Sequence, residues 1–285
     1  MRSRKDCRGC TGRRLRGLLN FFEWNGVSSN DFDTEVTKLI VRKSPNITRP
    51  SRKYQKYSVD GRNGDIYIPQ EAYNNFAAVY DLFLYTDEKG PMLNELSGKI
   101  AEWLYSPRGY ARLVDDHESE LFRLAYFTGP FDVENNLTIF GKAKAEFNCR
   151  PERFLICGDE FIPAEDMDEG WFTLNNKTSN TAKPLITIPL SDAPKLKIQI
   201  RHGNEAKQWI YTKQDGAASL TVDSDKMQWA SGVQYAGKNI VGDLEMPLLL
   251  PGENQVRIVN ANANNSEVET NKYPAWLIKP RWWVL

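Results

Sequence analysis

Residues 93–105 read LNELSGKIAEWLY, and here the apolar residues of the chain change their spacing. They fall at positions i, i+3, i+7, i+10 and i+11, as Leu93, Leu96, Ile100, Trp103 and Leu104. Residues spaced in this way share one face of an α-helix. Ser106-Pro107 then ends the pattern, because a proline disfavours helical backbone in the residue before it. The stretch predicts one amphipathic helix that needs an apolar surface to pack against.

The sequence on both sides of this helix is of strand type. Short runs rich in aromatic and β-branched residues are separated by Gly, Asn, Asp and Pro, which is typical of antiparallel strands. The runs are 21–27, 32–41, 53–59, 66–68 and 77–85 before the helix, and 110–114, 122–128 and 136–149 after it. The polar, basic residues 42–52 lie between two runs and predict a projecting arm or long hairpin. Residues 18–150 therefore predict a β-domain with one helix packed on it.

The second half of the chain has strand patterns only. The runs are 185–190, 196–201, 208–212, 219–222 and 255–260, and residues 251–254 (PGEN) look like a hairpin turn. Their spacing favours an antiparallel sandwich. Residues 150–153 form a plausible boundary, and the acidic residues 158–170 form a connector. We therefore expect an extension at 1–17, a first domain at 18–150, a connector at 151–170 and a second domain at 171–285.

The formal charge of zero conceals an asymmetry. Residues 1–17 contain seven Arg or Lys and one acid, Asp6, and so carry +6, which leaves −6 for the other 268 residues. A mildly acidic body argues against a nucleic-acid-binding protein. The basic extension is more typical of a solvated, disordered arm than of a phosphate-binding one. No apolar run approaches the ~20 residues of a membrane span, and the start lacks the apolar stretch of a signal peptide. We expect a soluble protein made in the cytoplasm, without membrane insertion.

Cysteines and histidines give weak evidence for metal binding. Cys7 and Cys10 have the spacing of half a zinc site, but a structural zinc needs four ligands, and His117 and His202 lie far away in sequence. The run 115–118 (DDHE) could hold a metal only if adjacent side chains converged, so it predicts a surface loop instead. Cys149 and Cys157 have apolar neighbours and are expected to behave as small hydrophobic residues.

Catalytic motifs are also missing from the sequence. It contains no GxxxxGK[ST], GxGxxG, GxSxG or HExxH pattern. Paired carboxylates occur at 159–160, 165–166 and 168–169, but they share one connector rather than a rigid scaffold. A hydrolase that uses this connector remains an open alternative. We predict no enzyme, and no catalytic, cofactor-binding or metal-binding residues.

The chain ends in an aromatic sequence, YPAWLIKPRWWVL at 273–285. An apolar terminus of this kind is expected to be packed. Adjacent residues of a strand point to opposite faces of the sheet. If Trp282 and Trp283 lie in one strand, their side chains therefore cannot both point into the same core. The expectation is that one of them lies in the core, while the other lies exposed, at a covered edge, or against another domain or subunit.

These features together resemble the distal tail (Dit) proteins of long, flexible-tailed phages. The resemblance covers residues 21–285 and depends on the order of several short motifs. They are Asn25-Gly-Val-Ser-Ser29, Val59-Asp-Gly-Arg-Asn-Gly-Asp65, Ile100-Ala-Glu-Trp-Leu104, Gly109-Tyr-Ala-Arg-Leu113, Ala125-Tyr-Phe-Thr-Gly129, Phe147-Asn-Cys-Arg-Pro151 and Pro280-Arg-Trp-Trp283.

The resemblance implies a mainly β fold: a tail-tube-like split β-barrel with one flanking helix, followed by a galectin-like β-sandwich. Such proteins are structural, and they form a six-membered ring at the tail tip of a virion. The ring joins the tail tube protein to the tail-associated hub or lysin protein, and in some phages the outer domains carry receptor-binding proteins. DNA only passes through the lumen.

Two points depart from or compete with this interpretation. The basic extension 1–17 is absent from the family pattern, and we expect its removal to leave folding intact. The alternative function is a carbohydrate-binding module that recognises a cell-wall glycan through the second domain. In that case Trp209, Trp229 and Tyr235 would stack on the sugar, although aromatic residues of a sandwich are more often part of its core.

Overall fold

The computed structural model describes residues 20–43, 48–137, 139–165, 167–268 and 272–285. The described residues form many β-strands, one α-helix and a few short 3-10 helices. The predicted mainly β fold class is therefore confirmed. The chain divides between Arg153 and Phe154 into two compact units, here called the N-terminal unit and the C-terminal unit. The domain limits expected at residues 150 and 171 stay a prediction.

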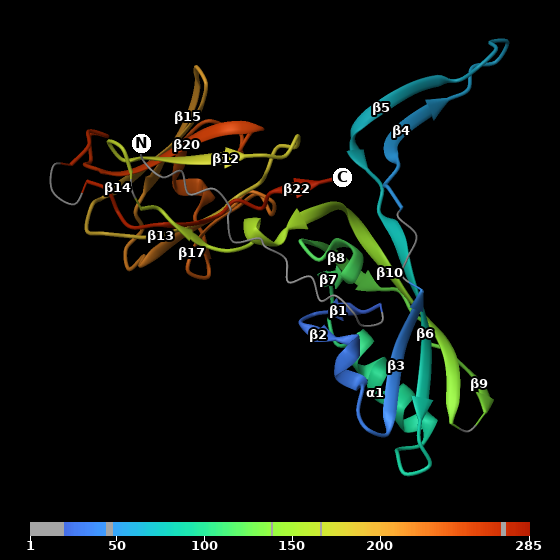
Figure 1. Cartoon of the computed structure of the whole chain (residues 1–285). Helices are drawn as coiled ribbons and strands as arrows, with labels where there is room; N and C mark the ends of the chain where they lie inside the picture. The colour runs from blue at the N-terminus through green and yellow to red at the C-terminus, as the bar shows by residue number, and fades with distance from the viewer. Residues whose placement is uncertain (1–19, 44–47, 138, 166, 269–271) are drawn as a thin grey trace, which may run out of the picture. The chain divides into compact units, whose positions relative to one another are not determined.

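The N-terminal unit is built on one curled antiparallel sheet (Figure 1). Its strands pair in the order β2-β1-β7-β8-β10-β6-β3, and β9 pairs with β10. Their bounds are β1 Phe22–Trp24, β2 Val27–Ser28, β3 Thr37–Lys43, β6 Phe76–Thr86, β7 Ala111–Asp115, β8 Leu121–Phe127, β9 Val133–Leu137 and β10 Phe140–Leu155. Short 3-10 helices span Ser29–Phe32 and Asp116–Glu118.

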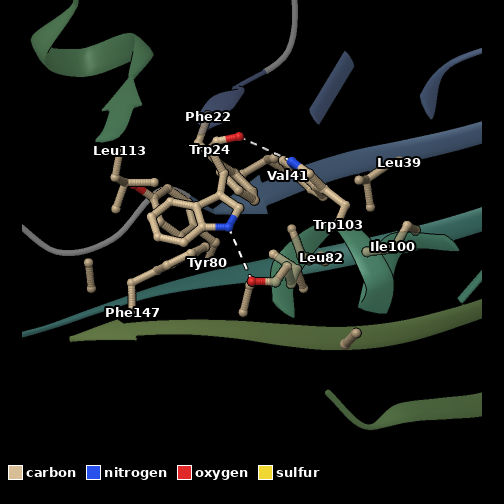
Figure 2. Packing of buried hydrophobic residues seen from close by; sticks show 14 of the residues in the cluster. Phe22, Trp24, Leu39, Val41, Tyr80, Leu82, Ile100, Trp103, Leu113 and Phe147 are labelled. Atoms are coloured by element: carbon tan, nitrogen blue, oxygen red, sulfur yellow. Dashed lines mark hydrogen bonds between the residues drawn. The ribbon is translucent and has the colours of Figure 1, made fainter. Parts of the chain in front are cut away.

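The helix α1 (Leu93–Tyr105) has the bounds that its apolar spacing predicts. All five residues of the predicted stripe are buried. Figure 2 shows how the helix is joined to β1: Trp24 Nε1 donates to the carbonyl of Leu104 (3.1 Å), and Trp103 Nε1 donates to the carbonyl of Trp24 (3.2 Å). These reciprocal bonds satisfy both buried indole groups, so the two tryptophans can fill the core without an unpaired donor.

The projecting element of this unit begins where the predicted arm ends. Residues 48–51 belong to no strand, and the projecting element is formed by β4 (Arg52–Tyr57) and β5 (Ile66–Tyr73). These two strands pair only with each other. Of the arm predicted at 42–52, residues 44–47 lie outside the described residues, while Arg42 belongs to β3 and Arg52 begins the hairpin. We call residues 52–73 the hairpin.

The C-terminal unit contains two antiparallel sheets around one core. One has the order β11-β21-β13-β16-β17-β18, and the other β12-β20-β14-β15-β19. The bounds are β11 Ile162–Pro163, β12 Trp171–Asn176, β13 Leu185–Pro189, β14 Lys195–His202, β15 Glu205–Thr212, β16 Ser219–Asp223, β17 Gln228–Ser231, β18 Gln234–Tyr235, β19 Ile240–Gly242, β20 Gly252–Ala261 and β21 Leu277–Lys279. The short strand β22 (Trp283–Val284) belongs to neither of these two sheets. Further 3-10 helices span Ile156–Gly158 and Gly237–Asn239. Alternate residues of the strands enter the shared core, as the predicted sandwich requires.

Two local expectations for this unit need correction. Residues 252–254 belong to β20, where Gly252 and Asn254 pair with Asn176 and Leu174, so the predicted hairpin turn at 251–254 is wrong. The aromatic terminus is packed against a single core: Trp282 is buried, and Trp283 is half-buried against the same cluster. Because Trp283 lies in the short strand β22 and Trp282 precedes it, the pair does not follow the alternation of one continuous strand.

Some expectations fall outside the described residues. The basic extension 1–17, with Cys7 and Cys10, belongs to this group. Among the residues that are described, no helix is long and apolar enough to cross a membrane.

Candidate assembly surface

The hairpin exposes apolar side chains that the rest of its unit does not cover. Every residue of β4 is exposed, and most of β5 is exposed as well. Its large exposed residues include Tyr54, Tyr57, Ile66, Tyr67 and Ile68. A two-stranded ribbon alone is at best marginally stable in water, and exposed apolar surface of this kind marks sites of protein interaction.

Both faces of the hairpin carry this apolar surface. Tyr54 faces Pro69 across the ladder and Tyr67 faces Lys56, and the rings of Tyr54 and Tyr67 lie 5.0 Å apart on this face. On the opposite face Tyr57 pairs with Ile66, and Gln55 pairs with Ile68. A ribbon that is apolar on both sides is suited to insertion between two surfaces.

A second feature of the N-terminal unit is its edge strand β3. The sheet order ends at this strand, which pairs with β6 and, within the described residues, with no other strand. The preceding loop already covers the start of this edge, because the Thr37 N–H donates to Thr34 Oγ1 (3.0 Å) and the Leu39 N–H donates to Asp33 Oδ1 (2.8 Å). An edge strand can present backbone groups to another chain only beyond such a cover. Lys38 and Arg42 lie on it and reduce indiscriminate pairing, because charged residues disfavour edge-to-edge aggregation. The part of the edge beyond Leu39 can therefore offer a short ladder to a specific partner strand.

The residues named for sugar stacking do not form one surface. Trp209 is 1% exposed and Trp229 is 6% exposed, and their rings lie 6.5 Å apart inside the sandwich core. Trp209 Nε1 donates to the carbonyl of Glu245 (2.9 Å). Tyr235 is 62% exposed on the edge strand β18. Because both indoles are core residues, the carbohydrate-binding alternative loses the stacking platform that it assumed.

The run 115–118 is not a surface loop as a whole. Asp115 is buried at the end of β7, where its carboxylate accepts from Arg123 Nη1 (2.7 Å) and from the Tyr80 hydroxyl (3.4 Å). Glu118 pairs with the guanidinium groups of both Arg123 and Arg153. The sequence did not predict this network because its arginines lie on other strands.

Tyr80 takes part in this network as a hydrogen-bond donor. Burial, followed by the charge of Asp115, raises the pKa of Tyr80 well above its ordinary value, so Tyr80 stays a neutral hydrogen-bond donor. His117 points to solvent, with its side chain 56% exposed. Among the described residues, no group of three or more His, Cys, Asp or Glu side chains is arranged to hold a metal ion.

The remaining candidate groups have separate local roles. His202 Nδ1 lies 2.9 Å from the carbonyl of Glu253. In the connector, Asp159 pairs with Lys279 (3.7 Å), and Asp168 exchanges backbone hydrogen bonds with Trp171 in a tight turn. Cys149 is buried in the core of the N-terminal unit, and this burial raises its pKa to about 12.

The hairpin surface is what sequence reasoning missed. The signal was present in RKYQKY (52–57), because Tyr54 and Tyr57 are three residues apart and so point to opposite faces of one strand. A strand with bulky residues on both faces is typical of burial between two layers, not of an edge facing water. The turn at 60–65 and the strand 66–68 were predicted, but their isolation from the sheet was not.

Comparison with solved structures identifies the fold. The chain is similar to the crystal structure of Dit of phage SPP1, a protein described as a paradigm of the hub adsorption apparatus in phages that infect Gram-positive bacteria. The TM-score is 0.60 and the sequence identity 11%, and the match covers 92% of this chain and 98% of that one. The resemblance to phage distal tail proteins is thus confirmed at the level of the fold. No family model matches the sequence, and no curated protein matches it either.

Proposed function

We propose that this chain is a structural distal tail protein of a long-tailed phage or prophage. In this proposal it forms a hexameric ring that joins the tail tube to the hub or baseplate at the tail tip and helps host attachment. The observation that carries the proposal is the similarity of fold to SPP1 Dit, which extends over both units. The uncovered hairpin supports it, because an assembly protein needs surface that only another subunit buries.

The hairpin and the edge strand β3 suggest how a ring would close. A ring uses heterologous contacts, in which one patch of a subunit meets a different patch of the next. The hairpin is one such patch, with apolar residues on both faces, and the end of β3 beyond Leu39 supplies a short ladder on the same unit. Two different docking features on one unit fit a head-to-tail contact better than a two-fold one.

The partners follow from this role. The chain contacts other copies of itself, the tail tube protein and the hub or lysin protein, and the C-terminal unit is available for a receptor-binding protein. It acts at the virion tail tip after synthesis in the host cytoplasm, and it has no enzymatic activity. The second unit corresponds to the galectin-like sandwich of the family resemblance. The residues after the basic extension carry no excess of positive charge. This composition suits a ring whose lumen lets DNA pass without binding it.

The oligomeric state tests the proposal. Native mass spectrometry and negative-stain microscopy of the purified full chain should give closed six-membered rings. The matched variants are Ile68→Ser in the hairpin and Met92→Ser, which changes an exposed apolar residue next to α1. We expect Ile68→Ser to lower the ring fraction and Met92→Ser to preserve it. A wild-type protein that stays monomeric at high concentration would contradict the proposal.

A further inference from the structure

The attachment of the hairpin to its unit is narrow. β5 ends at Tyr73 and β6 begins at Phe76, so Asn74 and Asn75 lie in neither strand. On the other side, residues 48–51 reach β4 without joining a strand. Figure 1 shows the ribbon leaving the end of β6 and extending away from α1. The direction of the hairpin therefore depends on what holds this junction.

Asn74 closes the hairpin but does not fix its direction. Its backbone N–H donates to the carbonyl of Ser51 (2.8 Å), and its Nδ2 donates to the Ser51 hydroxyl (3.0 Å). Arg52 Nη2 also donates to the Tyr73 hydroxyl (3.3 Å). All these bonds join the two legs of the ribbon to each other. They would be kept if the whole ribbon swung about the junction.

Asn75 connects the junction to the sheet through its side chain. Its Nδ2 donates to the Tyr110 hydroxyl (2.8 Å) and to Asn148 Oδ1 (2.6 Å). Asn148 lies on β10 opposite Ala77, and Tyr110 immediately precedes β7 and packs edge-on against Tyr126 of β8 (5.3 Å). An amide nitrogen has two hydrogens, and both are used here. The two acceptors come from different parts of the sheet, so together they set a direction.

We propose that Asn75 is a positioning residue, which holds the hairpin in the direction that a neighbouring subunit needs. This inference rests on the proposed ring. The hairpin acts as a lever, since the eight residues of β5 span ~26 Å at the usual rise of a strand. A small rotation at Asn75 therefore displaces the tip by many ångströms and separates its apolar faces from the partner surface.

The expected effect is moderate at one junction and larger in the ring. The net contribution of one exposed hydrogen bond corresponds to about a fivefold change in a two-state population. If the hairpin spends a smaller fraction of the time in the direction that allows docking, the apparent affinity of each contact falls in proportion to that fraction. Each contact of a closed ring uses one hairpin, so the loss compounds around the ring.

The test compares Asn75→Ala with two other variants in the full chain. Asn94→Ala is the matched control, because Asn94 is an exposed asparagine on the outer face of α1. Tyr110→Phe removes only one of the two acceptors. We expect the protein concentration at which half the chains are in rings to rise at least fivefold for Asn75→Ala, less for Tyr110→Phe, and not at all for Asn94→Ala. Mass photometry over a dilution series measures it.

Hydrogen exchange separates positioning from loss of fold. For Asn75→Ala in the unassembled protein, exchange should accelerate at residues 75–77, where β6 begins. The Asn74 N–H, the β4–β5 ladder and the rest of the core strands should keep their rates. Faster exchange throughout the N-terminal unit would overturn the inference, because it would mark Asn75 as a stabilising residue only. Rings that form as readily as in wild type would also overturn it. If the wild type forms no rings at all, the proposed function fails first, and the assembly role of Asn75 falls with it.

Discussion

At the residue scale, Arg281 combines an unusual backbone conformation with a partly buried ion pair. Its φ is 56°, a left-handed conformation that a non-glycine residue adopts at a cost of about 1–3 kcal/mol. In this conformation Arg281 Nη1 donates to Asp223 Oδ1 (2.6 Å) and Nη2 to Asp223 Oδ2 (3.3 Å). Burial disfavours the charged form of Asp223 and so acts to raise its pKa. The hydrogen bonds and charge of the Arg281 guanidinium act in the opposite direction, and the pKa of Asp223 is lowered overall. The ion pair offsets the strain of the turn that carries Trp282 into the core.

This pair predicts a pH-dependent stability. A carboxyl whose pKa is lower in the folded state stabilises the fold above its unfolded pKa and loses that effect as pH falls through the folded value. At pH 7, Asp223→Asn should therefore lower the free energy of unfolding by about 1–3 kcal/mol. Thermal melts should show the difference shrinking below about pH 4. Lys226→Met is the control, because Lys226 lies 3.9 Å from Asp223 and is 71% exposed. A difference that stays constant from pH 7 to pH 3 would refute this role.

Cys149 gives a second prediction at this scale. Burial raises its pKa to about 12, and the thiolate is the reactive form of a cysteine. In the native protein at pH 8, Cys149 should therefore resist alkylation by iodoacetamide. Site-resolved mass spectrometry measures the labelling of its peptide, and the same peptide in urea is the control. Rapid labelling in the native protein would show that the core of the N-terminal unit opens readily.

At the element scale, the end of the chain completes the sandwich. β21 lies inside its sheet, between β11 and β13, and Trp282 is 4% exposed beyond it. Trp282→Ala should destabilise the C-terminal unit by about 3–5 kcal/mol. Trp283→Phe keeps a ring and loses only the bond from Nε1 to the carbonyl of Thr181 (2.9 Å), at a cost of about 0.5–1.5 kcal/mol.

Denaturant unfolding measures both variants, and ending the chain at Lys279 extends the test. That truncation removes both tryptophans and Arg281, so the shortened protein should accumulate in the insoluble fraction. A soluble truncated protein with a wild-type unfolding transition would contradict the packing described here.

Elements with a strong local pattern were predictable from the sequence, and α1 is the best case. Its five apolar residues at helical spacing gave both of its ends. Strand-type runs likewise located five of the twelve described strands from β11 to β22, namely β13, β14, β15, β16 and β20. Pairing, in contrast, is decided over long sequence distances. Nothing local shows that residues 252–254 continue a ladder with β12, or that β4 and β5 leave the sheet.

The candidate assembly surface was predictable only in part, for the same physical reason. Tyr54 and Tyr67 could be assigned to strands, but exposure depends on which elements cover them. The Asn75 junction combines residues from three separate segments, and its partners Tyr110 and Asn148 have no recognisable spacing relative to it. Trp209 and Trp229 show the converse: aromatic content alone does not distinguish a core residue from a stacking platform.

At the scale of the whole molecule, each unit has its own buried core. The core of the N-terminal unit is centred on Phe22, Trp24, Tyr80 and Phe147, and that of the C-terminal unit includes Trp209 and Trp276. A region with a complete core can fold alone. The hairpin and the open edge of β3 both belong to the N-terminal unit. Each unit should therefore fold independently of the other, whereas ring formation should require the N-terminal unit.

We predict that residues 150–285, produced as a separate protein, are folded and monomeric. This fragment keeps the end of β10, where the Leu155 N–H donates to the carbonyl of Trp282 (2.8 Å), so both sheets of the sandwich stay complete. Circular dichroism should show a cooperative β-sheet melt, and sedimentation should give a single monomer at concentrations where the full chain forms rings. An unfolded fragment would refute the independence of the C-terminal unit. A folded fragment that forms hexamers by itself would instead move the ring contact away from the hairpin.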